Sequence, residues 1–534
     1  MTSFDTCMVA GCHPQTWQAI QNEKWQLIVV GGGITGAGIV LEAARQGLKV
    51  LLVEKHDFAW GTSSRSSKMV HGGLRYMAAG DIKTTRDSVH ERERLLKEAP
   101  GLVDLMTYAM PHYKKQFPNP FIFNALLWVY DLFSGNKYRQ FIRPAEFLKR
   151  YPLLKADAFL GATLFADAVT DDSRLVMRVL HEAVRAGACC INYVSADNIH
   201  CENDRVTGVT LKNQLTQEVV DISAEVVINA TGVWVDELRN KIVNEHKIRP
   251  SRGSHIVLSA ERLPVEDSLT ILHPDDQRPI FIYPWYGRTI VGTTDIDQDT
   301  IEQDEAGISE KELSYLLKLV QHYFSAAEIV KSDVIASFSG VRPLINSGAL
   351  SPSKEKRSHS VWENKGLVSV SGGKLTTFRL IAQDALKAAE KYISGFRLNP
   401  YSEHVFSPTA QPESDVSSLS EYTAKRLQGF YGYQFGSVVE TINKNEEQQA
   451  LAAWLLWGEL RWIAANESIQ HLDDLLLRRT RVGLLLEQGG LEFEQEVKTI
   501  CEQELGWDSA RWQVELERYV NILDAYYRQP TYQC

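Results

Sequence analysis

The chain contains little cysteine, and its seven cysteines follow no paired pattern. They stand at positions 7, 12, 189, 190, 201, 501 and 534, in an odd number and without a C-x-x-C motif. A chain of 534 residues has room for several hydrophobic cores, so a small disulfide- or zinc-stapled scaffold is excluded. We expect free thiols in a reducing compartment. We expect no metal site, because Cys7, Cys12 and His13 lack a second pair of ligands.

Long apolar runs and a basic surplus are also missing. No stretch reaches the roughly 18 apolar residues of a membrane-spanning helix; the nearest, Pro120–Phe133, is short and contains Asn124 and Asp131. The first fifteen residues have neither a basic region nor an apolar one, so we expect no signal peptide. The net charge of −10 argues against nucleic acid as a partner. A local basic cluster can still bind a small anion.

The composition is that of a globular protein with several domains, because 44% of the residues are hydrophobic and 23% are charged. We expect a polar, irregular N-terminal extension at 1–24, with one helical turn near Trp17–Gln21, and a core at 25–400. The Ser-, Pro- and Glu-rich residues 401–418 read as a linker. Residues 419–534 have helical periodicity throughout, which predicts a C-terminal helical domain.

The core begins with a βαβ unit. Leu27–Val30 and Lys49–Val53 read as buried parallel strands, and Thr35–Gln46 reads as the helix between them. A further helix follows at Asp172, which we predict as its N-cap. Another is expected at Glu310–Phe324.

The βαβ unit contains a dinucleotide-binding signature. Gly31, Gly33 and Gly36 form a G-x-G-x-x-G turn between strand and helix. Such a turn lets a pyrophosphate approach the positive end of the helix. Glu54 ends the next strand, where a carboxylate can accept hydrogen bonds from a ribose and disfavours a 2′-phosphate.

Two later segments favour FAD over a nicotinamide. Val226–Leu238 reads as a strand that ends in a turn of small residues. Val368–Arg379 presents Gly372 and Gly373 before a helix, whose N-terminus can stabilise the negative charge of a reduced flavin. The chain also has only one full dinucleotide signature, so no second nicotinamide site is evident.

Seven segments, in this order, resemble FAD-dependent, quinone-linked glycerol-3-phosphate dehydrogenases: GGGITGAGI, Gly61–Met77, INATGVWVDEL, Arg252–Leu258, Tyr283–Asp295, Ser339–Leu344 and Gly372–Arg379. Leu475–Gly483 is similar to the C-terminal helical domain of that family. The resemblance implies an α/β fold, in which an FAD-binding Rossmann-like domain of the glutathione-reductase/D-amino-acid-oxidase type is interleaved with an antiparallel-sheet substrate domain, plus an all-α domain. It places the FAD domain at about 25–95, 155–240 and 335–400, and the substrate domain at about 96–154 and 241–334.

The resemblance also implies the reaction: sn-glycerol 3-phosphate is oxidised to dihydroxyacetone phosphate by hydride transfer from C2 to flavin N5, and electrons pass to a membrane quinone. It places Arg75, Arg342 and Lys374 at the substrate, where cations suit a phosphate. It makes His255 the base for the C2 hydroxyl proton and Arg342 its catalytic partner. Which cation binds the phosphate stays open.

The same resemblance implies FAD contacts beyond the first turn. The hydroxyl-rich segment Thr62–Lys68 can donate several hydrogen bonds to the cofactor. The implied residues are Thr62, Ser63, Ser64, Lys68, Gly72, Gly73, Thr231, Gly232, Gly373, Lys374, Leu375 and Thr376. His71 either faces the flavin or packs beside Gly72.

A quinone acceptor requires contact with a bilayer, so we expect a peripheral protein on the cytoplasmic face of the cell membrane. Pro120–Phe133 is apolar, bears Trp and Tyr, and is flanked by Lys114, Lys115, Lys137, Arg139 and Arg143. Such a segment can lie in the interface and attract anionic lipid. An internal helix of the substrate domain explains it equally well.

The sequence leaves three alternative functions open. One is a glycerol-3-phosphate oxidase that uses oxygen, although the insertion typical of that relative is not evident. The second is a flavin-dependent amine or amino-acid oxidase, and the third is a non-catalytic flavin-binding scaffold. A homodimer is left open. The calcium-loop pattern of the mitochondrial relative does not occur after residue 400.

Overall fold

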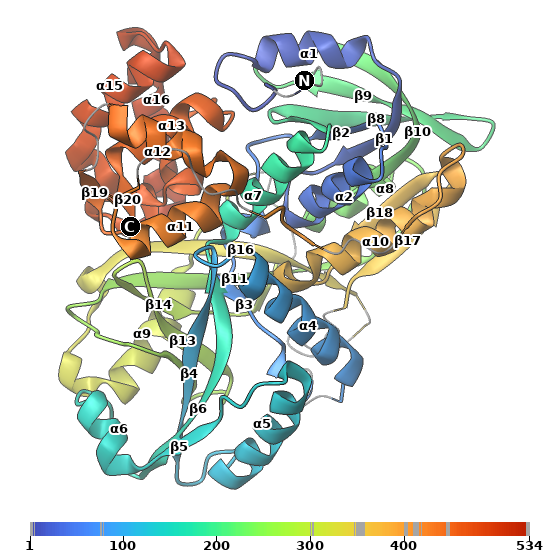
Figure 1. The fold of residues 1–534 in the computed structure, drawn as a ribbon. Coiled ribbons are helices and arrows are strands. Elements are labelled where there is room, and N and C mark those ends of the chain that lie inside the picture. Colours follow the sequence, from blue (N-terminus) through green and yellow to red (C-terminus); the bar gives the residue numbers. More distant parts are fainter. Residues whose placement is uncertain are drawn as a thin grey trace.

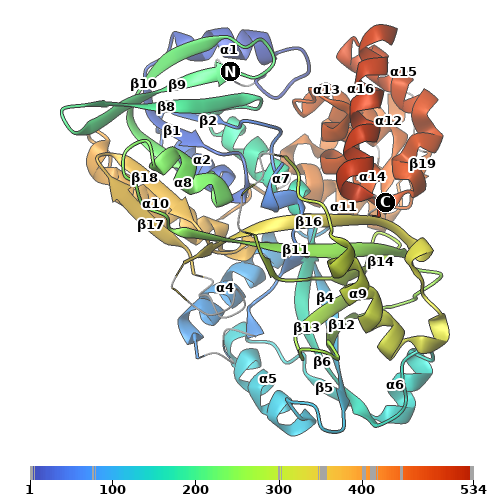
Figure 2. The same cartoon turned by 180° about the vertical axis from the view of Figure 1, so that it is seen from behind.

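The computed structural model of the chain describes residues 4, 6–74, 77, 80–298, 301, 304–346, 348, 358–399, 404–408, 416–417, 419–444 and 449–529. Two large sheets and a group of C-terminal helices make up the molecule (Figure 1). The view from behind shows that the long strands β11 and β16 cross the middle, between the first sheet above and the remaining strands of the second sheet below (Figure 2).

The first sheet is built on parallel strands in the order β18 (Leu367–Ser371), β10 (Val219–Asn229), β1 (Trp25–Val30), β2 (Val50–Val53) and β7 (Cys189–Ile191). These strands read as continuous apolar runs because both of their faces are covered. β17 (Ser360–Asn364) adds an antiparallel edge, and β8 (Val194–Glu202) and β9 (Arg205–Asn213) extend β10. Helices α2 (Ile34–Arg45), α7 (Asp172–Arg185) and α10 (Phe378–Ala389) pack together on this sheet.

The second sheet is mostly antiparallel. Its main order is β15 (Ile296–Asp297), β11 (Ile248–Ser259), β14 (Arg288–Gly292), β13 (Pro279–Trp285), β12 (Ser268–Leu272), β4 (Val103–Tyr113), β6 (Phe159–Thr170) and β3 (Met69–Val70). β16 (Val334–Ile345) pairs with β11, and β5 (Gln140–Ile142) pairs with β6. The helices of this half are α4 (Ile82–Glu98), α5 (Pro120–Ser134), α6 (Pro144–Arg150) and α9 (Glu310–Tyr323).

Three strands of the second sheet come from residues that the sequence assigns to the FAD domain. These are β3 and β6, which lie within the predicted ranges 25–95 and 155–240, and β16, which lies within 335–400 except for its first residue. Strand periodicity shows that a segment is extended but does not show which sheet it joins, because pairing partners are distant in the chain. The chain therefore passes between the two sheets at each of these strands.

The C-terminal part is helical, with one correction. It contains α11 (Glu421–Tyr431), α12 (Phe435–Lys444), α13 (Trp457–Asn466), α14 (Val482–Leu485), α15 (Glu494–Leu505), α16 (Ser509–Ile522) and π-helical turns at Asp474–Arg479 and Leu523–Tyr527. The prediction of unbroken helical periodicity was wrong at Ala450–Leu456, where β19 (Ala450–Ala452) and β20 (Leu455–Leu456) form a small antiparallel pair. An apolar run this short does not distinguish a strand from a buried helix.

Two smaller expectations change at helix starts. The N-terminal extension contains a helix, α1 (His13–Gln21), whose Trp17 and Ile20 are buried in the cluster around the first sheet. The N-cap of α7 is Asp171, whose side chain accepts the N–H of Arg174 at 3.1 Å, and not Asp172 as predicted. Two adjacent aspartates are equally good caps by sequence, so tertiary partners decide between them.

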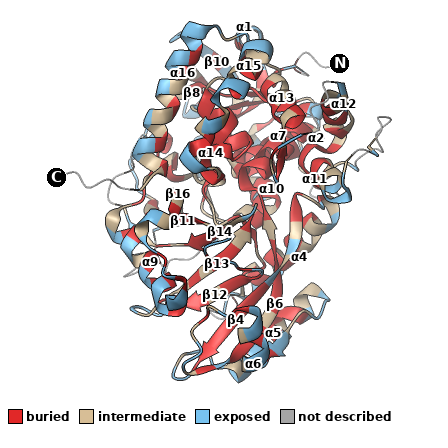
Figure 3. Ribbon diagram, turned by 90° about the vertical axis from the view of Figure 1, so that its left-hand side faces the viewer, coloured by how far each residue is buried: buried red, intermediate tan, exposed pale blue. Residues whose placement is uncertain are grey.

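Burial is continuous across the junction of the two sheets and the C-terminal helices, whereas exposed residues concentrate on the outer helices (Figure 3). Within the described residues, no helix is both long enough and apolar enough to cross a bilayer.

Candidate functional site

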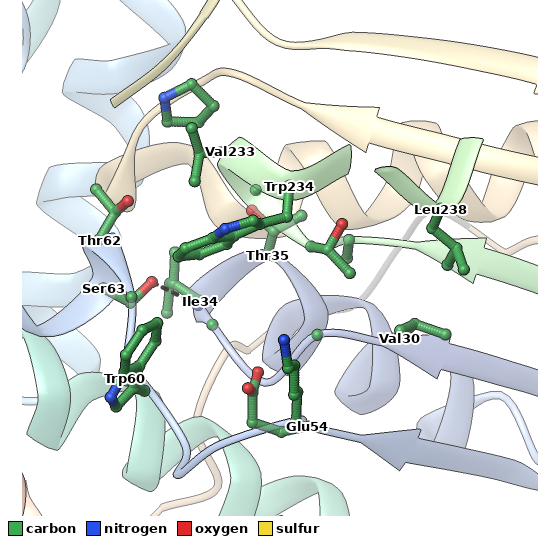
Figure 4. Close-up of a pocket in the computed structure, with 18 of the residues that line it drawn as sticks. Val30, Ile34, Thr35, Glu54, Trp60, Thr62, Ser63, Val233, Trp234 and Leu238 are labelled. Atoms are coloured by element: carbon green, nitrogen blue, oxygen red, sulfur yellow. Dashed lines mark hydrogen bonds between the residues drawn. The ribbon is translucent and has the colours of Figure 1, made fainter. Parts of the chain in front are cut away.

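A cavity of about 780 Å³ opens at the carboxyl ends of the parallel strands (Figure 4). Val30 ends β1, Glu54 follows β2, and Thr231 follows β10; all three line the cavity. Open α/β sheets bind ligands at this edge. The volume lies in the range of cofactor and small-molecule sites.

Glycines let backbone approach the cavity closely. Gly31 has φ +111°, and a Cβ there would lie 2.6 Å from the carbonyl oxygen of Ala230. A Cβ on Gly36 would lie 1.8 Å from the carbonyl oxygen of Gly31, so this glycine packs the helix against the turn. The first turn of α2 carries no acidic side chain, which leaves its positive end suited to an anion.

The Glu54 carboxylate is held at the end of β2. It accepts the N–H of Gly32 at 2.6 Å and the N–H of His56 at 2.9 Å. Burial raises the pKa of Glu54, and the two hydrogen bonds oppose that shift. The carboxylate therefore fixes the glycine turn while lying on the wall of the cavity.

Two tryptophans that sequence reasoning missed form another wall. The rings of Trp60 and Trp234 are 5.8 Å apart, and both residues line the cavity (Figure 4). Trp60 immediately precedes the segment Gly61–Met77, and Trp234 lies within INATGVWVDEL. An aromatic residue inside or beside each cofactor motif was the signal available.

The structure brings many of the expected FAD contacts together and leaves others outside the cavity. Those that line it are Gly31, Gly33, Glu54, Thr62, Ser63, Thr231, Gly232, Gly373, Lys374 and Leu375. Among them, Ser63 accepts the N–H of Ile34 at 3.0 Å, at the start of α2. Those not on its lining are Gly36, Ser64, Lys68, Gly72, Gly73 and Thr376.

Lys68 is the clearest case among the residues outside the lining. Its side chain is fully buried, and its Nζ donates to Asp172 at 3.0 Å and to the carbonyl oxygen of Ser64 at 2.8 Å. Burial lowers the pKa of Lys68 to about 8, although the nearby carboxylate opposes the shift. Lys68 thus holds its own loop, and Ser64 supplies part of that anchor.

The remaining outliers contribute to packing near the cavity. A Cβ on Gly72 would lie 2.1 Å from the hydroxyl of Tyr130, and the N–H of Gly72 donates to Asp167 at 2.9 Å. The carbonyl oxygen of Gly73 accepts from Thr85 at 3.4 Å. The Thr376 hydroxyl donates to the carbonyl oxygen of His71 at 3.4 Å.

His255 and Arg342 lie on one face of the second sheet. His255 is on β11, and a Cβ on Gly292 of the neighbouring β14 would lie 2.1 Å from its ring. The Arg342 guanidinium, from β16, lies over Gly253, two residues before His255 and therefore on the same face of β11. Arg342 donates to Thr293 at 2.9 Å and to Asp295 at 3.2 Å.

The imidazole of His255 is almost completely buried, with 1% of its surface exposed. It stacks on Phe338, with ring centroids 4.5 Å apart and planes inclined by 5°. Its pKa is well below 6.5, first because of burial and then because of the positive charges of Lys68 and Arg342. The ring is therefore neutral at neutral pH and able to accept a proton.

Two other cations, Lys374 and Arg75, are expected at the substrate. Lys374 follows the Gly372–Gly373 turn, lines the cavity, and donates to Ser88 of α4 at 2.7 Å. Arg75 lies outside the described residues.

These features fit FAD. The glycine turn and the unopposed helix end suit a pyrophosphate, and Glu54 suits a ribose hydroxyl. The cavity reaches from there past Thr62 and Ser63 to the turn at Gly373.

Comparison with known proteins agrees with this fit. A family model described as FAD dependent oxidoreductase matches residues 26–385, and one described as C-terminal domain of alpha-glycerophosphate oxidase matches residues 371–512. Over 532 residues the chain is 33% identical to glycerol-3-phosphate dehydrogenase 2 of Mycobacterium tuberculosis, covering 95% of this chain and 90% of the relative. The chain belongs to the FAD-dependent glycerol-3-phosphate dehydrogenase family.

Two further members agree with this assignment. The aerobic glycerol-3-phosphate dehydrogenase of Staphylococcus haemolyticus is 32% identical over 487 residues, covering 86% of this chain and 87% of the relative. The solved structure of glycerol-3-phosphate dehydrogenase from Bacillus halodurans, complexed with FAD, superposes with a TM-score of 0.76 at 26% identity, covering 96% and 98% of the two chains. The predicted fold class, the FAD cofactor and the oxidoreductase class are confirmed.

Proposed function

We propose that this protein oxidises sn-glycerol 3-phosphate to dihydroxyacetone phosphate and passes the electrons to a membrane quinone. The observation that carries the proposal is the pairing of a buried neutral imidazole, His255, with the guanidinium of Arg342 on one sheet face. The names of the relatives support the same substrate.

In this proposal His255 accepts the proton of the C2 hydroxyl. Its low pKa leaves a lone pair available at neutral pH, and Phe338 and Gly292 hold the plane of its ring. When bound, FAD supplies the acceptor for the hydride that leaves C2, so loss of the proton and the hydride together yields the ketone. Arg342 stabilises the negative charge that develops on the C2 oxygen.

The phosphate requires cations in a chain whose net charge is −10. Lys374 lines the cavity, and its ammonium donates to the Ser88 hydroxyl of α4. We assign the phosphate to Lys374 and Arg75 and leave Arg342 nearer to the reacting carbon. Arginine and lysine together combine a planar fork with a point charge.

An anaerobic spectrum of the purified protein tests this reaction. Glycerol 3-phosphate should bleach the visible flavin absorbance and form dihydroxyacetone phosphate in equal amount, whereas glycerol should bleach it far more slowly. Flavin that stays oxidised with glycerol 3-phosphate would overturn the proposal. Reoxidation by a quinone analogue without peroxide supports the quinone, and rapid peroxide release in air supports oxygen as the acceptor.

Contact with a membrane is proposed through α5. One stripe of this helix, Phe121, Trp128 and Leu132, is exposed by 83%, 53% and 62%, whereas Phe123 and Leu127 face the protein. The helix therefore has two apolar faces, one packed against its own domain and one exposed to solvent. Exposure of an apolar face costs free energy unless a partner covers it.

The charges around α5 favour a lipid surface on the cytoplasmic side. Lys114, Lys115, Lys137 and Arg143 are exposed around the helix, and α5 lies at the end of the molecule away from the C-terminal helices (Figure 1). An apolar stripe within a basic rim suits an anionic bilayer. Flotation with anionic vesicles tests this contact, and a protein that stays in the soluble fraction would overturn it.

A further inference from the structure

The plane of the His255 ring is fixed, but its packing does not select the edge that faces the reacting atoms. Phe338 stacks on the ring with centroids 4.5 Å apart, and the ring lies so close to Gly292 of β14 that a Cβ there would be 2.1 Å from it. A rotation of 180° about the Cβ–Cγ bond keeps that plane and exchanges each nitrogen with a carbon. Apolar packing costs nearly the same in both orientations, so a polar contact must choose between them.

Ser67 makes that contact. Its Oγ lies 2.9 Å from Nε2 of His255, within hydrogen-bonding distance. In the described part of the chain Nδ1 of the same ring has no hydrogen-bond partner, so the contact with Ser67 is the hydrogen bond that distinguishes the two edges there. In the flipped orientation a carbon would face the hydroxyl, and the hydrogen bond would be lost.

The loop holds Ser67 on both sides. The Asp172 carboxylate accepts two hydrogen bonds from Ser66, one from its backbone N–H at 2.9 Å and one from its hydroxyl at 2.7 Å. It also accepts one from the ammonium of Lys68 at 3.0 Å. Arg481, from the C-terminal helices, donates to the same carboxylate at 2.5 Å. Asp172, Lys68 and Arg481 are each at most 3% exposed. One buried carboxylate therefore fixes both neighbours of Ser67.

We propose that Ser67 is a positioning residue, which selects the ring orientation of His255 and so sets which atom of the imidazole meets the C2 hydroxyl. This inference rests on the proposed function, because it assigns Ser67 a role through the base. Ser67 lies inside the Ser-rich segment expected to contact FAD, where sequence alone does not separate a cofactor contact from a contact with a histidine of another strand.

The test compares Ser67→Ala with Ser67→Thr, which keeps the hydroxyl, in anaerobic stopped-flow reduction. Ser67→Ala should reduce the limiting rate of flavin reduction by about 5- to 50-fold, less than the loss of the base itself, with KM changed less than about 2-fold. Ser67→Thr should recover most of the rate. Ser337→Ala is the matched control. Within the described residues the hydroxyl of this buried serine on β16 makes only long hydrogen bonds, at 3.4 and 3.5 Å, and its removal should leave the rate unchanged.

A double-mutant cycle separates positioning from a general structural effect. In a His255→Ala background, Ser67→Ala should have no further effect on the rate, because the ring that it orients is gone. Equal fold-losses in both backgrounds, or a wild-type rate in the single variant, would overturn the inference.

The proposed function is checked first in the same assay. Wild-type flavin that glycerol 3-phosphate does not reduce refutes the proposed function. Normal wild-type reduction with an additive cycle refutes the role of Ser67 alone. Bound flavin is quantified in every variant, and loss of FAD from Ser67→Ala with a normal rate in the retained holoenzyme would make Ser67 a cofactor contact and overturn the inference.

Discussion

Removal of the His255 imidazole tests the chemistry most directly. A positioned general base contributes about 10²- to 10⁴-fold to a rate. The surroundings of His255 point to the lower end of this range, because burial, Lys68 and Arg342 all lower its pKa and make it a weak base. We therefore expect His255→Ala to slow flavin reduction by about 10²-fold, which is about 2.7 kcal/mol in the activation barrier.

The assay is anaerobic stopped-flow bleaching of the bound flavin at saturating glycerol 3-phosphate. His255 does not line the dinucleotide cavity, so His255→Ala should retain its FAD. The fraction of bound flavin therefore serves as the internal control for folding. Reduction at the wild-type rate by a fully loaded variant would remove His255 from the mechanism.

The pH dependence of the same rate provides a second arm. A histidine whose pKa is lowered is deprotonated throughout the neutral range, and it loses its lone pair only when the pH falls through that lowered value. The wild-type limiting rate should therefore stay flat as the pH falls from about 7.5 to about 6. A decline in the rate centred near the ordinary histidine pKa would contradict a pKa that is lowered by burial and by the charges of Lys68 and Arg342.

Three other outcomes are expected. Lys374→Ala and Arg75→Ala should each raise KM for glycerol 3-phosphate by about 10- to 10²-fold, because each removes one charge-assisted hydrogen bond to the phosphate. The slow reaction of glycerol should change little. Equal effects on both substrates would contradict a role of these residues in phosphate binding. Trp128→Glu should abolish flotation with anionic vesicles while leaving anaerobic flavin reduction unchanged. Retained flotation would exclude the exposed stripe of α5 as the membrane contact. Arg481→Met should destabilise the protein by about 3–5 kcal/mol because it leaves buried carboxylates without a partner. Arg528→Met is the control, because Arg528 and its partner Asp524 are 39% and 52% exposed, and it should cost about 1 kcal/mol or less. Similar melting temperatures for the two variants would refute a stabilising role of the buried cluster.

The local part of the site was predictable from the sequence. The glycine turn, its helix and Glu54 depend on contacts within one βαβ unit, and the observed strands and helix begin within two residues of the predicted ones. The positions of Thr231 and Gly373 at the same cavity also follow from sequence, because the carboxyl ends of parallel strands meet at one edge of the sheet.

The non-local part was not predictable in the same way. Lys68 and Ser67 are adjacent, yet one points to a buried aspartate of α7 and the other to a histidine of β11. A run of serines and basic residues reads as a flexible or cofactor-binding loop, because nothing in it encodes partners about 100 or 190 residues away. Asp172 illustrates the same limit, since its sequence position suits a helix cap while its buried partners assign it to the loop.

Buried ion pairs also hold the C-terminal helices against the strands and loops around the cavity. Arg478 and Arg479 donate to Asp57, which follows the cavity-lining Glu54 by three residues, at 2.6 and 2.7 Å. Arg481 pairs with Asp171 and Asp172 at 2.7 and 2.5 Å.

Buried ion pairs add little net stability over an apolar contact, but they are costly to break and demand one geometry. An apolar contact has no preferred direction, so it constrains the orientation of the helices on the FAD-binding half less closely. The arginines of Asp474–Arg481 instead tie the helices to the turn after β2 and to the loop that carries Ser67. The loop whose Ser67 contacts the His255 ring is therefore held by a segment that lies more than 200 residues after His255 in the chain.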